Sequence, residues 1–245
     1  MKQAWYLGYG AEEVADRALL VGDPDRVDRI ADMMTEVRFL PVKRGLKSIT
    51  GRYAGRPVTV AAFGMGAPIA TIVAHELADL GVRHLLRIGT AMYFPDAKAG
   101  DLVTASAAIS FEGTSKSYSG SNGLKADTAL LRAVDKAASA AGALVKKGLF
   151  ATFDAFYREM FALPGDTEAE RRVAANRARL ADIGAIAADM ETSALMSVSR
   201  ALGLSCGSIC LATVDGLTLE KIDAEAMAAG EPLLFRIGLD ALTAR

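Results

Sequence analysis

Apolar runs of strand length alternate with longer amphipathic segments along this chain, and that alternation restricts the fold more than any other feature. Residues 15–22 (ADRALLVG), 82–91 (VRHLLRIGTA) and 207–217 (GSICLATVDGL) are typical of buried strands, whereas residues 69–80 and 189–202 have helical spacing of apolar side chains. Strands that alternate with helices are joined by right-handed crossovers. We therefore predict an α/β fold with a central mixed, mostly parallel sheet.

Further elements fit the same architecture. Residues 25–36 are expected to form a helix with Arg26 in its first turn, and residues 47–64 a hairpin that turns at Ala54-Gly55. A charged helix is expected over residues 168–181. The sequence contains no internal repeat, linker or second core, so we expect residues 1–245 to form a single three-layer α/β/α domain.

Composition excludes several classes of function. A net charge of -1 provides no field for attracting nucleic acid or an anionic membrane. No apolar run approaches bilayer length and the N-terminus does not resemble a signal peptide, so a cytoplasmic protein without a membrane partner is expected. Cys206 and Cys210 lie in an apolar run without partner ligands, which predicts buried free thiols. Structural roles are expected for His75 and His84, and no metal site is expected.

Three arginines are candidates for binding an anion: Arg26 in VGDPDRV, Arg44 in VKRGL and Arg87 in LLRIGT. An arginine stays charged in a protein and offers a planar fork of donors, so several arginines at one point form a site for a tetrahedral oxyanion such as phosphate. Two of the three lie where a strand gives way to a turn, which is where open α/β sheets bind ligands.

Neighbouring residues strengthen two of these positions. Gly22 permits close approach of the backbone, and Thr90 adds a hydroxyl donor beside Arg87. An arginine that ends an apolar strand is costly to bury without an anionic partner. The loop GMGAP, which contains Gly64 and Gly66, is open to two interpretations: backbone N–H donors for an anion, or a tight turn that requires positive φ.

Two acidic residues are candidates for further roles. Glu191 precedes a small, apolar helical face, so its carboxylate is suited to accept hydrogen bonds from two adjacent sugar hydroxyls, although an acid at a helix N-terminus also complements the helix dipole. Asp215 ends a buried strand before Gly216, a position suited to proton transfer.

The ordered motifs GDPDRV, GMGAP, RIGT, EGTS, FDAFY, DMET and VDG resemble those of nucleoside phosphorylases of the uridine phosphorylase and hexameric purine nucleoside phosphorylase type. The resemblance extends over nearly the whole chain and implies the nucleoside phosphorylase-like fold. It also implies homodimers that assemble into homohexamers, because each active site borrows residues from a partner. Phosphate would be held by Gly22, Arg26, Arg87 and Thr90, with Arg44 reaching it from the neighbouring subunit.

The same resemblance implies where the nucleoside lies. Ribose would be held by Met190, Glu191 and Tyr6, the last in place of the family's histidine for the 5'-hydroxyl. The base pocket would contain Phe156, Ala91, Met92 and Asp215. Positions that read uracil in uridine phosphorylases are occupied by Met160 and Ala162, and Asp215 resembles the aspartate that faces purine N7 in some purine nucleoside phosphorylases.

The resemblance therefore implies phosphate-dependent cleavage of the glycosidic bond of a purine nucleoside, giving free base and ribose 1-phosphate. Arg87 and Asp215 would be the catalytic residues, inorganic phosphate the co-substrate, and no cofactor would be needed. Uridine phosphorylase or a broad-range phosphorylase is the nearest alternative. A nucleosidase of the same fold, and a nucleoside-binding protein without turnover, remain further alternatives. The retained arginines oppose the nucleosidase, and Tyr6, Ala91 and Met92 are the grounds for the binding protein.

Overall fold

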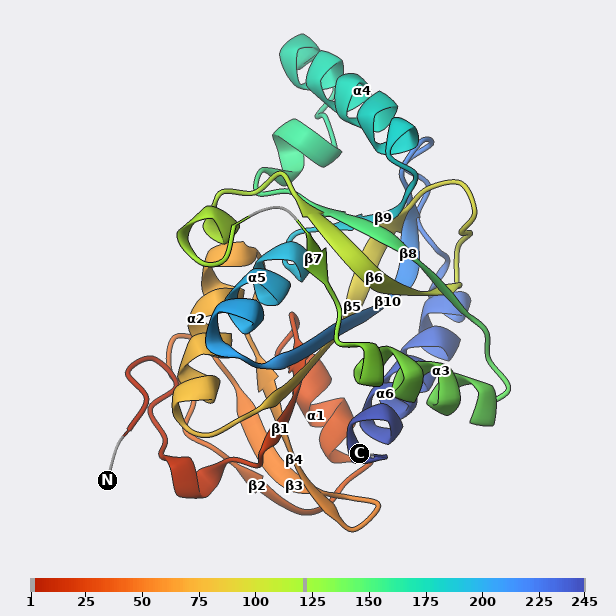
Figure 1. Ribbon diagram of the computed structural model, residues 1–245. Coiled ribbons are helices and arrows are strands. Elements are labelled where there is room, and N and C mark those ends of the chain that lie inside the picture. Colours follow the sequence, from red (N-terminus) through yellow and green to blue (C-terminus); the bar gives the residue numbers. More distant parts are fainter. Residues whose placement is uncertain (1–2, 121–122, 245) are drawn as a thin grey trace.

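The computed structural model describes residues 3–120 and 123–244, where helices pack around a twisted ten-stranded sheet (Figure 1). The strands are β1 (Arg17–Val21), β2 (Thr35–Phe39), β3 (Ser48–Tyr53), β4 (Arg56–Ala62), β5 (His84–Tyr93), β6 (Leu102–Ser110), β7 (Leu124–Lys125), β8 (Val145–Thr152), β9 (Ala185–Asp189) and β10 (Ser205–Asp215). The helices are α1 (Asp25–Ala31), α2 (Ala67–Asp79), α3 (Thr128–Ala140), α4 (Thr167–Asp182), α5 (Thr192–Leu202) and α6 (Ala224–Thr243). Within these described residues, no helix has the length and apolar character needed to cross a bilayer.

The sheet is mixed, and part of it closes on itself. Its strand order is β10-β6-β8-β9-β5-β1-β4-β3-β2, and β10 also pairs with β5. Strands β5, β10, β6, β8 and β9 consequently form a ring, whereas β1, β4, β3 and β2 extend from β5 as an open sheet. The central strand β5 runs parallel to both β1 and β10; its carboxyl end lies beside that of β10, and β1 ends beside Ile88 in the middle of β5.

Alternating side chains on β1 show how the two faces are covered. Ala18 and Leu20 pack in the cluster that includes α2 and α5, whereas Leu19 and Val21 pack in the cluster that includes α1, α3 and α6. Successive side chains of a strand point to opposite faces, so a strand buried on both faces is mainly apolar. All five residues of β1 are buried, and four of them form the apolar run ALLV that follows Arg17.

The predicted strands and hairpin agree with the structure, and the hairpin has a clear physical basis. Ala54 and Gly55 have φ of 48° and 76°, and they connect β3 to β4 directly. A two-residue hairpin loop needs positive φ at both central positions so that its twist matches the twist of the strands. The predicted helices over 69–80 and 168–181 correspond to α2 and α4.

Two predicted helices were too long. The helix expected over residues 25–36 ends at Ala31, and Glu36 lies in β2, whose pairing with β3 overrides the local helical pattern. The segment 189–202 is helical only from Thr192, because Asp189 is the last residue of β9.

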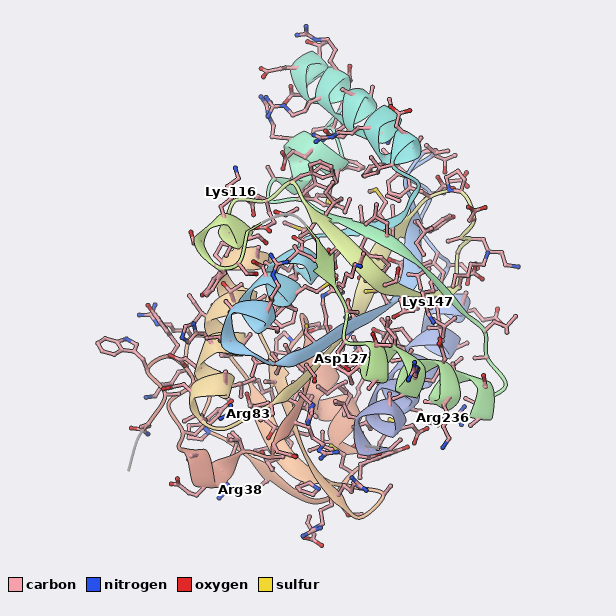
Figure 2. The ribbon with its side chains drawn as sticks, viewed as in Figure 1. Arg38, Arg83, Lys116, Asp127, Lys147 and Arg236 are labelled. Carbon is pink, nitrogen blue, oxygen red and sulfur yellow. The ribbon has the colours of Figure 1, made fainter. Side chains whose placement is uncertain are left out.

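Helix α3 was not predicted. Its N-cap, Asp127, is labelled in Figure 2 and accepts a hydrogen bond from the Leu130 N–H at 2.8 Å. An aspartate that caps the first turn in this way is typical of a helix start.

Candidate functional site

A cavity of about 490 Å³ lies where the loops after β1 and β4 meet the second half of β5 and the end of β9. It collects most of the predicted site residues from four separate segments of the chain. Those that line it are Gly22, Arg26, Arg87, Thr90, Ala91, Met92, Phe156, Met190 and Glu191. Arg44, Tyr6 and Asp215 are not among the described residues that line it.

Glycines bring two loops of the site together. The Gly64 N–H donates to the Gly22 carbonyl at 3.0 Å, and a Cβ on Gly22 would lie only 2.9 Å from the Gly64 oxygen. Gly64 and Gly66 have φ of 85° and 99°, so the turn itself requires glycine. The Gly66 N–H also donates to Glu191 Oε1 at 2.7 Å. The GMGAP loop is therefore a tight turn that requires glycine, and its Gly66 N–H also donates to an acidic side chain.

Arg26 reaches the cavity from the first turn of α1, just after the Gly-Asp-Pro turn that follows β1. Its side chain is buried, and its Nε donates to Glu231 Oε1 at 2.8 Å. Arg29, one turn later on α1, donates from Nη1 to the other oxygen of Glu231 at 2.5 Å. One buried carboxylate on α6 therefore binds two arginines of α1.

Arg87 projects from β5 into a cluster of anionic and polar groups and is 4% exposed. Its Nη2 lies 2.6 Å from Glu191 Oε2, and its Nη1 lies 3.3 Å from Asp189 Oδ2 and 2.7 Å from Cys210 Sγ. Its Nε is buried without a hydrogen-bond partner in the described part of the chain. A buried arginine was expected to need an anionic partner. Asp189 and Glu191 of the protein itself provide two carboxylates for Arg87.

The charges in this cluster affect one another strongly. Burial by itself would lower the pKa of Arg87, but the adjacent Cys210, Asp189 and Glu191 raise it above its ordinary value. Burial also raises the pKa of the Cys210 thiol, with Arg87 acting in the opposite direction. Because the guanidinium stays protonated, it is a permanent positive charge beside the cavity.

Asp189 is fixed by hydroxyl and amide donors. Its Oδ1 accepts from Thr152 Oγ1 at 2.9 Å, and its Oδ2 accepts from the Thr192 hydroxyl. Glu191, two residues later, occupies the N-cap position of α5 and is 5% exposed. The chain between β9 and α5 therefore points two carboxylates at Arg87 from one short turn.

A second group of residues that line the cavity is apolar. Ala91, Met92, Met160 and Ala188 line it together with Phe156, which begins a short helical turn, Phe156–Met160. The Phe156 ring stacks on Phe161 with centroids 5.9 Å apart and an interplanar angle of 6°. Flat aromatic and thioether surfaces of this kind suit a planar apolar group.

Asp215 has a different environment from the one its position suggested. Its carboxylate accepts from the backbone N–H groups of Leu217 and Thr218 at 2.7 and 2.9 Å and is also bonded to Tyr93. Partial burial would raise the pKa of Asp215, but these hydrogen bonds lower it below its usual value. Asp215 is consequently ionised at neutral pH and closes the turn after β10.

Arg44 and Tyr6 lie together. The Arg44 guanidinium carbon is 5.3 Å from the centre of the Tyr6 ring, a cation–π geometry. The Tyr6 N–H donates to Glu76 Oε1 at 2.8 Å, which fixes this segment to α2. These two predicted site residues thus form a pair of their own, separate from the residues that line the cavity.

Asp189, Cys210 and Glu231 were not predicted to contact the arginines of the site. Asp189 and Cys210 belong to segments that contain predicted residues. The pairing of β5 with β9 brings Asp189 to Arg87, and the pairing of β5 with β10 brings Cys210 to it. Glu231 is 205 residues from Arg26 along the chain, and no spacing rule connects them. In residues 3–120 and 123–244, no group of three or more His, Cys, Asp or Glu side chains is arranged to hold a metal ion.

Known proteins share both the sequence and the fold. The chain is 32% identical to uridine phosphorylase of Thermococcus kodakarensis over 212 residues, which are 85% of this chain and 76% of that protein. It is 33% identical to guanosine phosphorylase of Halorubrum lacusprofundi over 206 residues, covering 83% and 79% respectively. The crystal structure of uridine phosphorylase from Vibrio fischeri superposes with a TM-score of 0.86 at 30% identity, covering all of this chain and 98% of that one.

The expected resemblance is therefore confirmed at the level of the family. The match to the family extends over residues 16–233, which include the strands and loops that form the cavity and the acidic turn between β9 and α5. The chain belongs to the phosphorylase superfamily.

Proposed function

We propose that the protein is a nucleoside phosphorylase, which transfers the pentosyl group of a nucleoside to inorganic phosphate and releases the free base and ribose 1-phosphate. The observation that carries this proposal is the make-up of the cavity wall, in which Arg26, Arg87 and Thr90 occur together with the apolar side chains of Phe156 and Met92. The arginines and the hydroxyl suit phosphate, and the apolar side chains suit a base. Relatives named as uridine and guanosine phosphorylases support the same reaction class.

The phosphate would lie against Gly22, Arg26, Arg87 and Thr90, with Arg44 of a neighbouring subunit as a further ligand. The charge on Arg87 and the forked donors of Arg26 supply charge-assisted hydrogen bonds to its oxygens. Because Glu191 already accepts from Arg87 Nη2, phosphate and Glu191 would share this guanidinium.

The ribose would lie between the phosphate and the base, held by Met190, Glu191 and the neighbouring subunit's Tyr6. A phosphate oxygen attacks the anomeric carbon as the C–N bond breaks, and the bonding electron pair leaves with the base. Anionic phosphate beneath a developing oxocarbenium ion is stabilising, and binding both reactants in one cavity removes much of the entropic barrier.

Asp215 would assist the leaving base. Since its pKa is lowered, Asp215 would not donate a proton itself; it would accept a hydrogen bond from the leaving base after that base takes a proton from solvent. Contact with the base requires the turn at residues 215–218 to shift, because Asp215 is outside the described cavity lining.

We propose a purine nucleoside as the substrate, on the grounds of Asp215 and of the apolar residues Met160 and Ala162 at the uracil-reading positions. Uridine is the second candidate, favoured by the relatives and the solved structure that are named uridine phosphorylases. Bulky Met92 in the cavity wall also favours a one-ring base.

The proposed assembly is a homodimer that associates further into a homohexamer. The separation of the Arg44–Tyr6 pair from the lining of the cavity supports a role for these residues in a neighbour's site. We also propose that residues 1–245 form one three-layer domain, that the protein works in the cytoplasm, and that the reaction needs phosphate but no cofactor.

Base release measured for inosine, guanosine, adenosine and uridine, with and without phosphate, tests the proposal. Release that requires phosphate and yields ribose 1-phosphate is expected. Equal release in phosphate-free buffer would identify a hydrolase instead, and tight nucleoside binding without release would identify a binding protein.

A further inference from the structure

Glu231 of α6 forms ion pairs with two arginines of α1, and neither Glu231 nor Arg29 belongs to the cavity wall or to the predicted site. Glu231 is 6% exposed on α6, and its two oxygens bind Arg26 Nε at 2.8 Å and Arg29 Nη1 at 2.5 Å. Of these three residues only Arg26 lines the cavity. Because the buried carboxylate of Glu231 contacts Arg26 from outside the cavity, it can determine which guanidinium nitrogens of Arg26 face the cavity.

The nitrogen of Arg26 that bonds Glu231 decides which nitrogens of Arg26 remain for a ligand. Glu231 binds the Nε of Arg26, and neither Nη1 nor Nη2 has a hydrogen-bond partner within residues 3–120 and 123–244. The guanidinium is planar, so a bond fixed at Nε also fixes the direction of the remaining donors. Nη1 and Nη2 of Arg26 are therefore available to donate hydrogen bonds to a ligand in the cavity.

Arg29 balances the charge. A lone buried carboxylate next to an anion site would repel the anion, and the positive charge of Arg29 opposes this repulsion because it is paired with Glu231. Arg29 also lies 3.8 Å from Asp23 of the loop that precedes α1, and its guanidinium carbon is 5.5 Å from the centre of the Phe235 ring of α6. It therefore connects the turn before Arg26 to the C-terminal helix.

We infer that Glu231 is the positioning residue for phosphate: it binds Arg26 through Nε, directs both terminal nitrogens at the phosphate, and with Arg29 makes α6 part of the phosphate site. This inference rests on the proposed function. It assigns to the C-terminal helix a role in binding the nucleophile, although Glu231 itself does not touch the substrate.

Steady-state kinetics of Glu231→Gln and Glu231→Met test the inference. Glutamine keeps one acceptor for Arg26 or Arg29 but not for both, and methionine keeps none. We expect the phosphate KM to rise in both variants, by about tenfold or more with methionine and less with glutamine, since loss of one oriented charge-assisted contact is of this size. The nucleoside KM should stay within about twofold of the wild-type value, because Glu231 does not line the cavity.

Two further variants separate positioning from structural damage. Arg29→Met keeps the Arg26–Glu231 bond but removes the cation that opposes the charge of Glu231, so its phosphate KM should rise while its nucleoside KM stays unchanged. Because Glu231 is buried and buried charges are screened little by salt, the rise should persist at high ionic strength. Arg236→Met, on an exposed part of the same helix (Figure 2), should change neither KM. Isothermal titration with inorganic phosphate alone provides a readout that does not depend on turnover.

Unchanged or tighter phosphate binding in Glu231→Gln and Glu231→Met would overturn the inference and leave the proposed function intact. An equal rise of both KM values would also overturn it, because it would indicate general damage. If the wild-type protein neither binds phosphate nor requires it for base release, the proposed function fails, and the inference fails with it.

Discussion

Glu191 Oε2 lies 2.6 Å from Arg87 Nη2, so the residue proposed to bind ribose is ion-paired with a residue proposed to bind phosphate. Both residues are buried, with exposed fractions of 5% for Glu191 and 4% for Arg87. Binding of phosphate at Arg87 therefore changes the electrostatic environment of Glu191 directly. This contact provides a physical route for each substrate to influence the binding of the other, without any movement of the backbone.

The first prediction concerns Arg87. Arg87→Met leaves Asp189 and Glu191 as buried charges without their cation, which is expected to cost about 3–5 kcal/mol of folding free energy. Arg87→Lys keeps the charge but loses the planar fork, so it should be less destabilised while its phosphate KM still rises about tenfold or more. Urea denaturation and phosphate-dependent kinetics measure the two effects. Arg171→Met, on an exposed face of α4, is the matched control, and equal stability of Arg87→Met and that control would contradict the prediction.

Sequence patterns predicted Gly22 at the end of β1, but Arg87 and Thr90 do not end their strand as expected: both lie inside β5 (His84–Tyr93). They reach the site because the last residue of β1, Val21, pairs with Ile88 in the middle of β5. Local pattern was also enough for the Ala54-Gly55 hairpin, because its turn requires positive φ.

The contacts that sequence did not predict depend on packing between distant segments. Glu231 meets Arg26 only because α6 packs beside α1, and Asp189 meets Arg87 only because β9 pairs antiparallel with β5. Strand β9 was missed because its sequence, AIAAD, is rich in alanine and has a single β-branched residue. Its burial on both sides, rather than any intrinsic propensity, makes it a strand.

The second prediction concerns assembly. If Arg44 completes a neighbour's phosphate site, Arg44→Ala and Glu191→Ala proteins are each inactive but carry their defects in different parts of the shared site. Mixing them under conditions where subunits exchange should restore activity, because a mixed dimer contains one site with both residues intact. Activity assays before and after mixing, together with light scattering, provide the measurement. A fully active monomer would be incompatible with this arrangement.

The third prediction concerns the two thiols. Burial raises the pKa of Cys206 to about 11, and it also raises the pKa of the completely buried Cys210. Because the thiolate is the reactive species, both cysteines should resist a disulfide reagent at neutral pH in the folded protein and react rapidly in denaturant. Rapid labelling of either thiol in the native state would show that β10 opens locally.

The fourth prediction concerns acid stability. Burial would raise the pKa of Glu112, but hydrogen bonds from Ser115, Ser110 and Ser193 hold it below the ordinary value of 4.5. A carboxyl with a lowered pKa stabilises the fold fully above its unfolded-state pKa, and this contribution is lost as the pH falls through the lowered value. Wild type should therefore be more stable than Glu112→Gln at neutral pH, with the difference shrinking below about pH 4.5. Thermal unfolding from pH 7 to pH 3 tests this, and a difference that grows in acid would have the wrong sign.

The last prediction concerns the base. Met160 lines the cavity. We proposed that it occupies a position that reads uracil in uridine phosphorylases, and its side chain cannot supply the donors and acceptors that uracil would require. A site without polar partners for its substrate discriminates poorly in its favour, so inosine or guanosine should exceed uridine in kcat/KM. Asp215→Asn should lower kcat on the purine substrate by about 10²-fold or more, since loss of the negative charge removes stabilisation of the protonated leaving base. Because asparagine can still accept from the Leu217 and Thr218 N–H groups, the turn after β10 should survive, and an unchanged thermal midpoint would confirm this. Faster cleavage of uridine than of every purine nucleoside would instead show that the cavity binds a pyrimidine base. If kcat is also unaffected in Asp215→Asn, Asp215 serves only to close the turn after β10.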